Sequence, residues 1–327
     1  MKQPVGKTSA GRRILQRVGK VLLILLAIIV MLLLICYVNH CIQLRREEHL
    51  FVSVGTQVEV NGHTMNVYTE GTRGSTLVFL SGGGTCSPML DFRSLYSLLS
   101  DKYRIAVVEK AGYGFSDVTR DAPRDIDTIL EESRQALRLA GVEGPYVLCP
   151  HSMSGLEAVY WAQRYPEEVV AIIGLDMAVP EIYEEYPVSM LLQRMAAFAA
   201  NIGLTRWLPG LESDAVRYGT LTEEEKTLYR AVFYRRTATA DMLREAEMVK
   251  QNARIVANGG RPDVPMLLFA SNGEGTGWNE EQWRSYPRQF LLDSGGRLVE
   301  LDCGHYVHDF EYTYIAQEIK EYLKGMT

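Results

Sequence analysis

The chain has 327 residues, of which 47% are hydrophobic, and a formal net charge of −6. This length suits one large domain with a sizeable core. Residues 1–20 contain six Lys or Arg and no acid, so the remaining residues carry −12. An acidic body of this kind argues against a nucleic acid as the partner. The five cysteines have no paired spacing, which argues against a disulfide framework and a zinc site.

An apolar run without charged residues follows the basic N-terminus, at residues 21–38. At about 1.5 Å per residue, a helix of this length nearly crosses a hydrocarbon core of about 30 Å. A cleaved signal peptide fits less well, because the run is long and no small-x-small cleavage site follows it. We predict a basic cytoplasmic segment at 1–20, a transmembrane anchor at 21–41 and an α/β domain at 42–327. The protein would then cross the cell membrane once, with its domain outside the cytoplasm.

Strand and helix patterns alternate through the rest of the chain. Residues 57–60 and 64–68 flank Asn61-Gly62, a typical two-residue turn of a β-hairpin. Further strands are expected at 76–80, 104–108, 146–148, 169–175, 265–269 and 297–301, and helices at 89–99, 125–139, 156–165 and 314–323. Continuous apolar strands between helices predict an α/β fold whose mostly parallel sheet is covered by helices on both faces.

The alternation stops between about residues 179 and 260, where the pattern is helical throughout. This segment follows one predicted strand and precedes another. It would therefore lie over the carboxyl ends of the strands, where ligands bind in such sheets. We predict a helical lid here. Its stretch 190–208 is unusually apolar, and ordinary burial statistics favour packing of these side chains onto the body.

The most informative segment is YVLCPHSMSG at 146–155, an apolar strand that runs into a serine and then into a helical stretch. This is the layout of a nucleophile elbow, a strained strand-to-helix turn that exposes its central side chain. We predict Ser152 as the nucleophile. Pro150 and Ser154 stand where the usual Gly-x-Ser-x-Gly pattern has glycine. The alternative interpretation is a serine that caps an ordinary helix.

A serine nucleophile needs a base, and the base needs an orienting acid. In sheets of this type the three follow in the order serine, acid, histidine. Only His305 and His308 lie after Ser152, and His305 directly follows the last predicted strand, so we predict it as the base. Glu274 and Asp176 each follow a strand. Chain order favours Glu274 as the acid, with Asp176 as the alternative.

Two backbone N–H groups are needed to hold the oxyanion that forms during acyl transfer. Met153 supplies one, as the residue after the nucleophile. Gly83 is our choice for the second, because the glycine run 82–84 follows an earlier strand and would lie at the same sheet edge as Ser152.

Five pieces of the chain together resemble the α/β-hydrolase superfamily. They are 80–84 (LSGGG), 109–117 (EKAGYGFSD), the elbow at Ser152, the strand 265–269 with Glu274, and Gly304-His305. The resemblance spans about residues 54–325 and is to serine esterases, lipases and proline iminopeptidases. It implies the α/β-hydrolase fold and a Ser-His-acid triad. Dehalogenases and epoxide hydrolases of the superfamily use an aspartate nucleophile, and Ser152 argues against both.

These observations predict a membrane-anchored serine hydrolase that cleaves a carboxylic ester with an apolar acyl group, through an acyl-enzyme. We expect no metal and no organic cofactor, and a small-molecule ester or amide as the substrate. Two alternatives stay open. An aminopeptidase or amidase on the same fold would need an acidic lid pocket, for which Glu181, Glu184 and Glu185 are candidates. A non-catalytic binding or sensor protein could keep the fold with an altered elbow.

Overall fold

The computed structural model describes residues 8–119, 121–208, 211, 213–292 and 294–326. Within these residues, eight strands form one sheet in the order β1-β2-β4-β3-β5-β6-β7-β8. The strands are β1 (Thr56–Val60), β2 (His63–Glu70), β3 (Thr76–Leu80), β4 (Arg104–Glu109), β5 (Tyr146–Pro150), β6 (Val169–Leu175), β7 (Met266–Ala270) and β8 (Arg297–Glu300). β2 is antiparallel to both of its neighbours, and all other pairs are parallel. The predicted mostly parallel sheet is confirmed.

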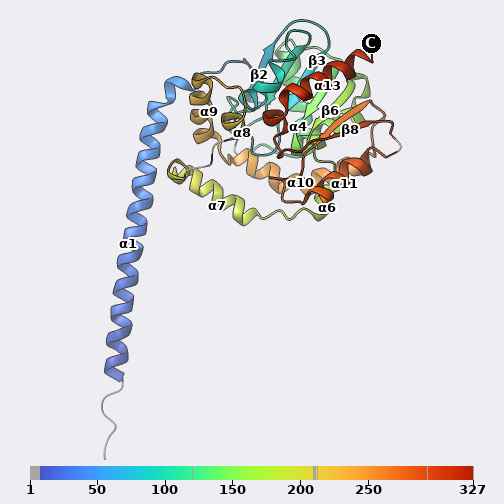
Figure 1. The fold of residues 1–327 in the computed structure, drawn as a ribbon. Coiled ribbons are helices and arrows are strands. Elements are labelled where there is room, and N and C mark those ends of the chain that lie inside the picture. The colour runs from blue at the N-terminus through green and yellow to red at the C-terminus, as the bar shows by residue number, and fades with distance from the viewer. Residues whose placement is uncertain (1–7, 120, 209–210, 212, 293, 327) are drawn as a thin grey trace, which may run out of the picture.

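Helices cover both faces of the sheet (Figure 1). One face carries α4 (Ile126–Leu139), α5 (Gly155–Arg164) and α11 (Glu280–Phe290), and the other carries α3 (Arg93–Tyr96) and α13 (Tyr312–Lys324). Short helices and 3-10 turns complete the body: η1 (Glu48–Leu50), α2 (Pro88–Asp91), η2 (Ser152–Ser154), η3 (Pro166–Glu168) and α12 (Val307–Phe310). Strand residues alternate between the two layers. In β3, Val78 and Leu80 belong to one core, and Leu77 and Phe79 to the other.

Two differences from the predicted elements concern the segment 89–99 and α11. The helix expected at 89–99 is divided into α2 and α3 at Phe92, which has a φ of −82° and a ψ of 0°. The buried Phe92 ring packs against Phe79 and His308, with centroids 5.2 and 4.7 Å away. α11 was not predicted, because its sequence is strongly polar and Pro287 lies inside it.

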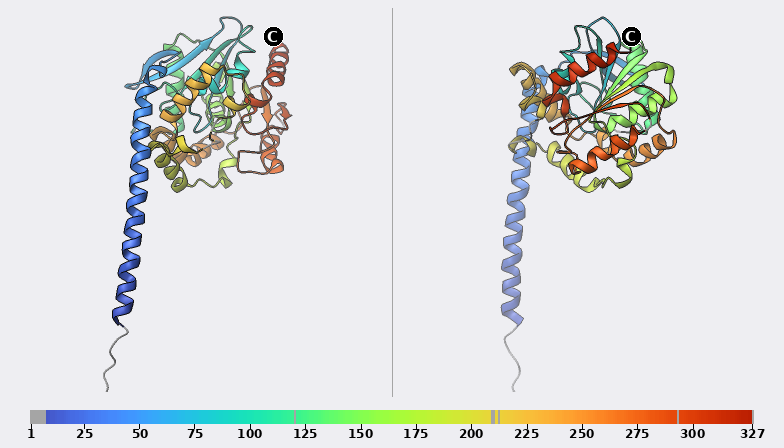
Figure 2. Two further views of the ribbon diagram at one scale, coloured as in Figure 1. Left: turned by 60° about the vertical axis from the view of Figure 1, so that its left-hand side comes forward. Right: turned by 45° about the vertical axis from the view of Figure 1, so that its right-hand side comes forward.

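The N-terminal helix α1 (Thr8–Arg46) extends beyond the predicted anchor at both ends. It is long and apolar enough to cross a membrane, and the residues of its most apolar part are not buried against the domain. Figures 1 and 2 show that α1 stands beside the domain and continues well past it. The part of α1 near Arg46 contacts the domain. The long apolar helix is therefore attached at one end only.

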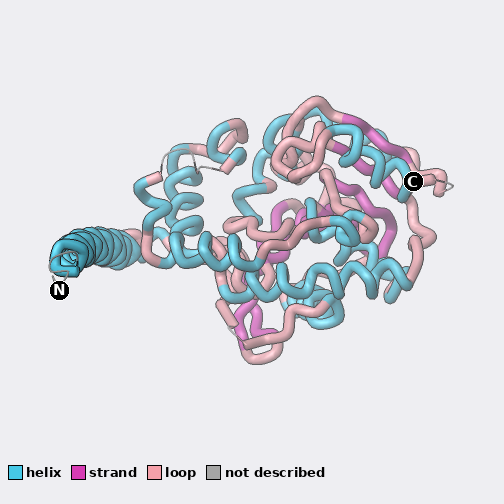
Figure 3. The backbone as a smooth tube through the Cα atoms, turned by 90° about the horizontal axis from the view of Figure 1, so that it is seen from below, coloured by secondary structure: helices cyan, strands magenta, loops and turns pink. Residues whose placement is uncertain are grey.

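The helical segment predicted at about 179–260 is present, with no strand among its described residues. It comprises α6 (Ile182–Glu185), α7 (Met190–Asn201), η4 (Leu204–Trp207), α8 (Asp214–Arg217), α9 (Glu223–Arg236) and α10 (Ala240–Asn258), which we call the helical insert. Figure 3 shows its helices in front of the strands, on the side of the domain toward which α1 extends. The prediction that stretch 190–208 packs onto the body is wrong for its outer side. There, five large apolar side chains are more than half exposed: Leu191, Leu192, Met195, Phe198 and Trp207.

Candidate active site

The turn from β5 into α5 is strained at Ser152, which has a φ of 53°. Positive φ is uncommon for a non-glycine residue, and such strain concentrates at functional sites. Glycine is required at two close approaches around this turn. A Cβ atom on Gly155 would lie 2.2 Å from the Ala178 backbone oxygen, and one on Gly82 would lie 2.8 Å from Ser152 Cβ. The turn therefore has the exposed, strained geometry that the sequence predicts for an elbow.

The two departures from the usual elbow pattern fit this structure. Ser154 is fully buried, and its hydroxyl lies 2.6 Å from the Leu80 carbonyl oxygen, to which it donates. The Ser154 hydroxyl oxygen in turn accepts the N–H of His151 at 3.0 Å. A glycine could make neither bond, so Ser154 ties the elbow to β3. Pro150 is the last residue of β5 and lies opposite Leu80.

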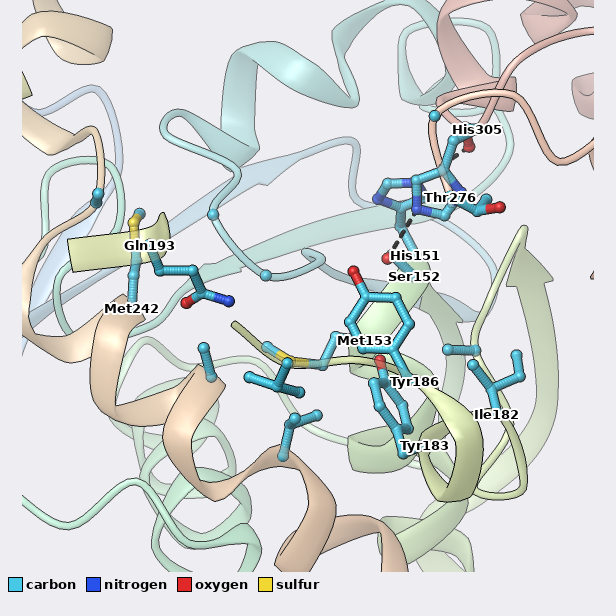
Figure 4. A pocket seen from close by; sticks show the side chains of 18 of the residues that line it. His151, Ser152, Met153, Ile182, Tyr183, Tyr186, Gln193, Met242, Thr276 and His305 are labelled. Atoms are coloured by element: carbon cyan, nitrogen blue, oxygen red, sulfur yellow. Dashed lines mark hydrogen bonds between the residues drawn. The ribbon is translucent and has the colours of Figure 1, made fainter. Parts of the chain in front are cut away.

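Ser152, His305 and Asp176 form an unbroken chain of hydrogen bonds. His305 Nε2 lies 2.8 Å from Ser152 Oγ (Figure 4), and its Nδ1 lies 2.6 Å from Asp176 Oδ2. Asp176 is buried, and its Oδ1 accepts the Ser271 N–H at 2.6 Å and the Trp283 indole N–H at 2.7 Å. The carboxylate is thus held in one orientation by three donors on three separate segments.

The structure brings Asp176, and not the favoured Glu274, to His305. β6 lies directly beside β5, so Asp176 leaves the sheet next to the turn that carries Ser152. Glu274 has an exposed side chain, while its backbone carbonyl oxygen accepts the N–H of His305 at 2.9 Å. Chain order favoured Glu274 but was a weak guide, since both acids follow a strand and precede His305.

His151 was not predicted as part of the site, although it directly precedes Ser152. Its buried ring lies 4.6 Å from the ring of His305, and its Nε2 lies 3.2 Å from the His305 carbonyl oxygen. Burial, and then the charge that His305 or His308 can carry, holds the pKa of His151 well below its usual range. His151 is therefore a neutral ring that supports the His305 loop from below.

A buried polar cluster lies behind this histidine loop. His308 is fully buried, and its Nε2 lies 3.0 Å from Asp91 Oδ2. Asp309 is equally buried, and neither carboxyl oxygen has a hydrogen-bond partner among the described residues. Asp91, His308 and Asp309 offer ligand atoms within 4.8 Å of one another, a set that could hold a small cation. Burial, and then the charges of Asp91 and Asp214, raise the pKa of Asp309 well above its usual range, so a proton can neutralise it instead.

Ser152 lines a cavity of about 450 Å³ (Figure 4). Its floor comes from the body and includes Ser152, Met153 and His305. Its walls come largely from the insert and are mostly apolar or aromatic: Ile182, Tyr183, Tyr186, Val188, Ala196, Met242, Leu243 and Val249. Gln193 adds a polar amide from α7. This is the usual character of a small-molecule site, apolar with a few polar groups.

The residues predicted for the oxyanion hole lie in the same cavity as Ser152. Gly83 and Met153 both line it, and they are in contact, since a Cβ atom on Gly83 would lie 2.8 Å from Met153 Cε. Gly83 therefore brings its backbone close to the elbow without a side chain in the way. The oxyanion role of the two N–H groups remains a prediction.

A buried charge network joins the body to the insert below the cavity. Lys110 Nζ lies 2.6 Å from Glu157 of α5 and 2.5 Å from Glu245 of α10. Burial raises the pKa of Glu157 to about 7, and the adjacent Lys110 limits this rise. Although burial opposes it, the two carboxylates raise the pKa of Lys110 overall. The insert is thus fixed to the body by a paired, buried cation.

Two comparisons of sequence give a consistent result. A family model for the alpha/beta hydrolase fold matches residues 75–312. YbdG of Bacillus subtilis (strain 168), an uncharacterized protein, is 40% identical over 262 residues, which are 78% of this chain and 80% of that protein.

Solved structures are similar at lower identity. An enol-lactonase from Burkholderia xenovorans LB400 is 18% identical with a TM-score of 0.61, over 82% of this chain and 100% of the other. A membrane phospholipase A, a bacterial virulence factor, is 20% identical with a TM-score of 0.60, over 95% of this chain and 98% of the other. These likenesses concern the fold. Because the family model spans most of the sequence, the chain belongs to the α/β-hydrolase family, which supports a hydrolytic enzyme in general.

Proposed function

We propose that the protein is a membrane-anchored serine hydrolase that cleaves a carboxylic ester through an acyl-enzyme intermediate. The observation that carries this proposal is the hydrogen-bonded chain from Ser152 Oγ through His305 to Asp176. A hydroxyl becomes a useful nucleophile when a base within about 2.6–3.2 Å can take its proton. The proposal assigns the role of the acid to Asp176 in place of Glu274.

In the first half of the reaction, Ser152 Oγ attacks the ester carbonyl carbon while His305 Nε2 takes the hydroxyl proton. Asp176 accepts the hydrogen bond of Nδ1–H and stabilises the imidazolium. The N–H groups of Gly83 and Met153 hold the oxyanion. The intermediate expels the alcohol, which receives the proton from His305, and the acyl group stays on Ser152. Water then attacks the acyl-enzyme by the same steps and releases the acid.

The apolar walls of the cavity favour an apolar acyl group. Burial of each methylene contributes about 0.8 kcal/mol, so a chain of several carbons would bind better than acetate. The test is a series of esters of one alcohol with acyl chains of two to twelve carbons. We expect kcat/KM to rise with chain length until the cavity is filled. A series in which acetate is the best substrate would contradict the apolar acyl group.

The triad is tested by labelling the full-length protein in detergent with a fluorophosphonate, which reacts with activated serines. We expect the wild type to be labelled, Ser152→Ala to be unlabelled, and Glu274→Gln to be labelled like the wild type. A folded wild type that takes no label would contradict the proposal. It would favour the binding or sensor protein instead.

The amidase or aminopeptidase alternative receives less support. Recognition of a free amine would need a carboxylate in the cavity. Glu181, Glu184 and Glu185 are exposed, and none of the three lines the cavity. Turnover of an aminoacyl amide at a higher kcat/KM than that of the matching acyl ester would reverse this preference.

The anchor is part of the same proposal. Residues 21–41 would span the membrane, and the basic residues at 1–20 would stay in the cytoplasm. In right-side-out membrane vesicles, added protease should then digest the domain. Digestion only after the vesicles are opened would show the reverse orientation.

A further inference from the structure

Helix α7 carries its small and polar residues on one side and its large apolar residues on the opposite side. Gln193 and Ala196 face the cavity, and Ala197 and Ala200 are buried. The opposite side carries four large apolar side chains at helical spacing: Leu191, Leu192, Met195 and Phe198. The one charged residue in α7 is Arg194, which pairs with Glu247 at 2.6 Å. On a helix at the surface of a soluble domain, the side that points away from the core is normally polar.

The outer side of α7 is nevertheless open. Leu191 is 71% exposed, Leu192 65%, Met195 59% and Phe198 58%. Three further apolar side chains that follow α7 in the chain are also exposed: Trp207 of η4, at 59%, and Leu208 and Leu211. Contiguous exposed apolar surface on a folded domain marks a site of protein or membrane contact. We call these seven residues the outer apolar surface.

The position of this surface relative to α1 is fixed by direct contacts. Arg206, next to Trp207, donates from Nε to His40 Nδ1 at 3.0 Å and forms a paired interaction with Glu47 at 2.7 Å for both nitrogen–oxygen contacts. Gly203 has a φ of 73°, and a Cβ atom there would lie 2.3 Å from His40 Cβ. His40 lies two residues after Val38, the last residue of the apolar run of α1. The outer apolar surface is therefore attached where that run ends.

The side of the domain that carries α7 also faces the direction in which α1 extends. In Figures 1 and 2, α7 lies on the lower side of the domain, the side toward which the free part of α1 extends. In Figure 3, seen from below, helices lie in front of the strands of the domain, and α1 is seen almost end-on beside the domain. A membrane that holds the apolar run of α1 would thus meet the insert before any other part of the domain.

We propose that the outer apolar surface contacts the lipid bilayer, with Leu191, Leu192, Met195 and Phe198 at the boundary of headgroups and acyl chains. This proposal rests on the proposed function, because it takes α1 as the membrane anchor. Trp207 sits at the level where tryptophan is enriched in membrane proteins. Gln193 and Ala196, on the opposite side of α7 from these four side chains, line the cavity. The substrate class that fits is an amphiphilic ester that reaches Ser152 from the bilayer past α7.

Contact is tested with the full-length protein in phosphatidylcholine–phosphatidylglycerol vesicles whose acyl chains are brominated, since bromine quenches tryptophan at close range. Phe198→Trp places a reporter on α7. Leu139→Trp is the matched control, because Leu139 is 54% exposed and ends α4 at the edge of the sheet opposite Ser152. We expect at least about twofold more quenching from the added tryptophan at 198 than from that at 139. Equal quenching in protein that floats with the vesicles would overturn the proposal.

Flotation separates this failure from failure of the proposed function. A protein that does not float with the vesicles has no anchor, and the bilayer contact falls with it. A protein that floats but takes no fluorophosphonate is not an active hydrolase, and the quenching result still decides the contact.

Delivery from the bilayer is tested with Leu192→Asp/Phe198→Asp beside Leu139→Asp as the control. The double variant should hydrolyse a bilayer-embedded ester at least about tenfold more slowly than the wild type. Its rate on a water-soluble short-chain ester should be unchanged, which also shows that it folds. An unchanged rate on the embedded ester would overturn delivery past α7.

Discussion

Helices α4 and α7 handle their apolar residues in opposite ways. α4 begins at an Asp125 cap, whose carboxylate accepts the Thr128 N–H at 2.9 Å, and buries Ile126 and Leu130 against the sheet. Of its charged residues, Asp127 and Glu131 face solvent, whereas Glu132 and Arg134 are buried and form ion pairs. α7 points its largest apolar side chains away from the protein. The body is therefore complete by itself, whereas the insert has a surface that only a partner can cover.

The comparison assigns the reacting groups to the body and the entry of the substrate to the insert. The hydrogen-bonded groups Ser152, His305 and Asp176 all belong to the body, where burial and pairing fix them. The insert supplies the walls of the cavity and the outer apolar surface. Changes in the body should act on every substrate equally. Changes on the outer side of α7 should act only on substrates that are held in a membrane.

The largest effect is expected from Ser152→Ala. Loss of the attacking hydroxyl should reduce kcat by roughly 10⁶-fold. The reduction should be the same for a water-soluble and a bilayer-embedded ester, in contrast to the α7 variants. Steady-state rates on the two esters check this, and a residual rate that depends on the kind of ester would contradict the separation of chemistry from access.

The second effect concerns the acid. Asp176→Asn keeps the shape of the side chain but removes the charge that orients His305, so kcat should fall about 10⁴-fold. Glu274→Gln is the matched control, and its kcat should stay within about threefold of the wild type because its side chain is exposed. A large loss in Glu274→Gln together with a small loss in Asp176→Asn would mean that Glu274 is the acid.

A third effect tests the close approach of the elbow to the loop after β6. In Gly155→Ala the new methyl group would meet the Ala178 backbone oxygen, which cannot rotate away. We expect the free energy of unfolding to fall by about 2–3 kcal/mol, measured by urea denaturation in detergent. In Gly304→Ala the nearest atom would be 3.6 Å away, so this control should be nearly neutral. Equal stability of the two variants would argue against the crowded turn.

The smallest effect concerns the network that joins body and insert. The pKa of Glu157 is raised to about 7 from a usual value of 4.5, so between these values the native protein keeps a proton that the unfolded chain has released. The free energy of unfolding should therefore decrease as pH rises through this window. Glu157→Gln cannot titrate, and its decrease should be smaller by at least about 1 kcal/mol. Urea denaturation of the wild type and of Glu157→Gln from pH 4.5 to 7.5 tests this. If the free energies of unfolding of the two proteins change with pH in parallel, Glu157 is not the group that titrates.

Local sequence signals were enough for most of the fold. The hairpin turn at Asn61-Gly62 was predictable because both residues tolerate the positive φ values of 51° and 79° that the turn requires. β3 and β6 were located correctly, since short apolar runs between turn signals depend little on distant residues. The Ser152 turn and the approach of His305 followed from motif order along the chain.

Only the tertiary structure shows which carboxylate lies beside His305 and which side of α7 is exposed. Asp176 and Glu274 each follow a strand and precede His305, and only the order of strands in the sheet places Asp176 beside the elbow. The apolar pattern of α7 predicts that these side chains are buried, but the sequence cannot predict which surface buries them. That answer depends on the cavity between α7 and the body, and on the direction in which α1 leaves the domain.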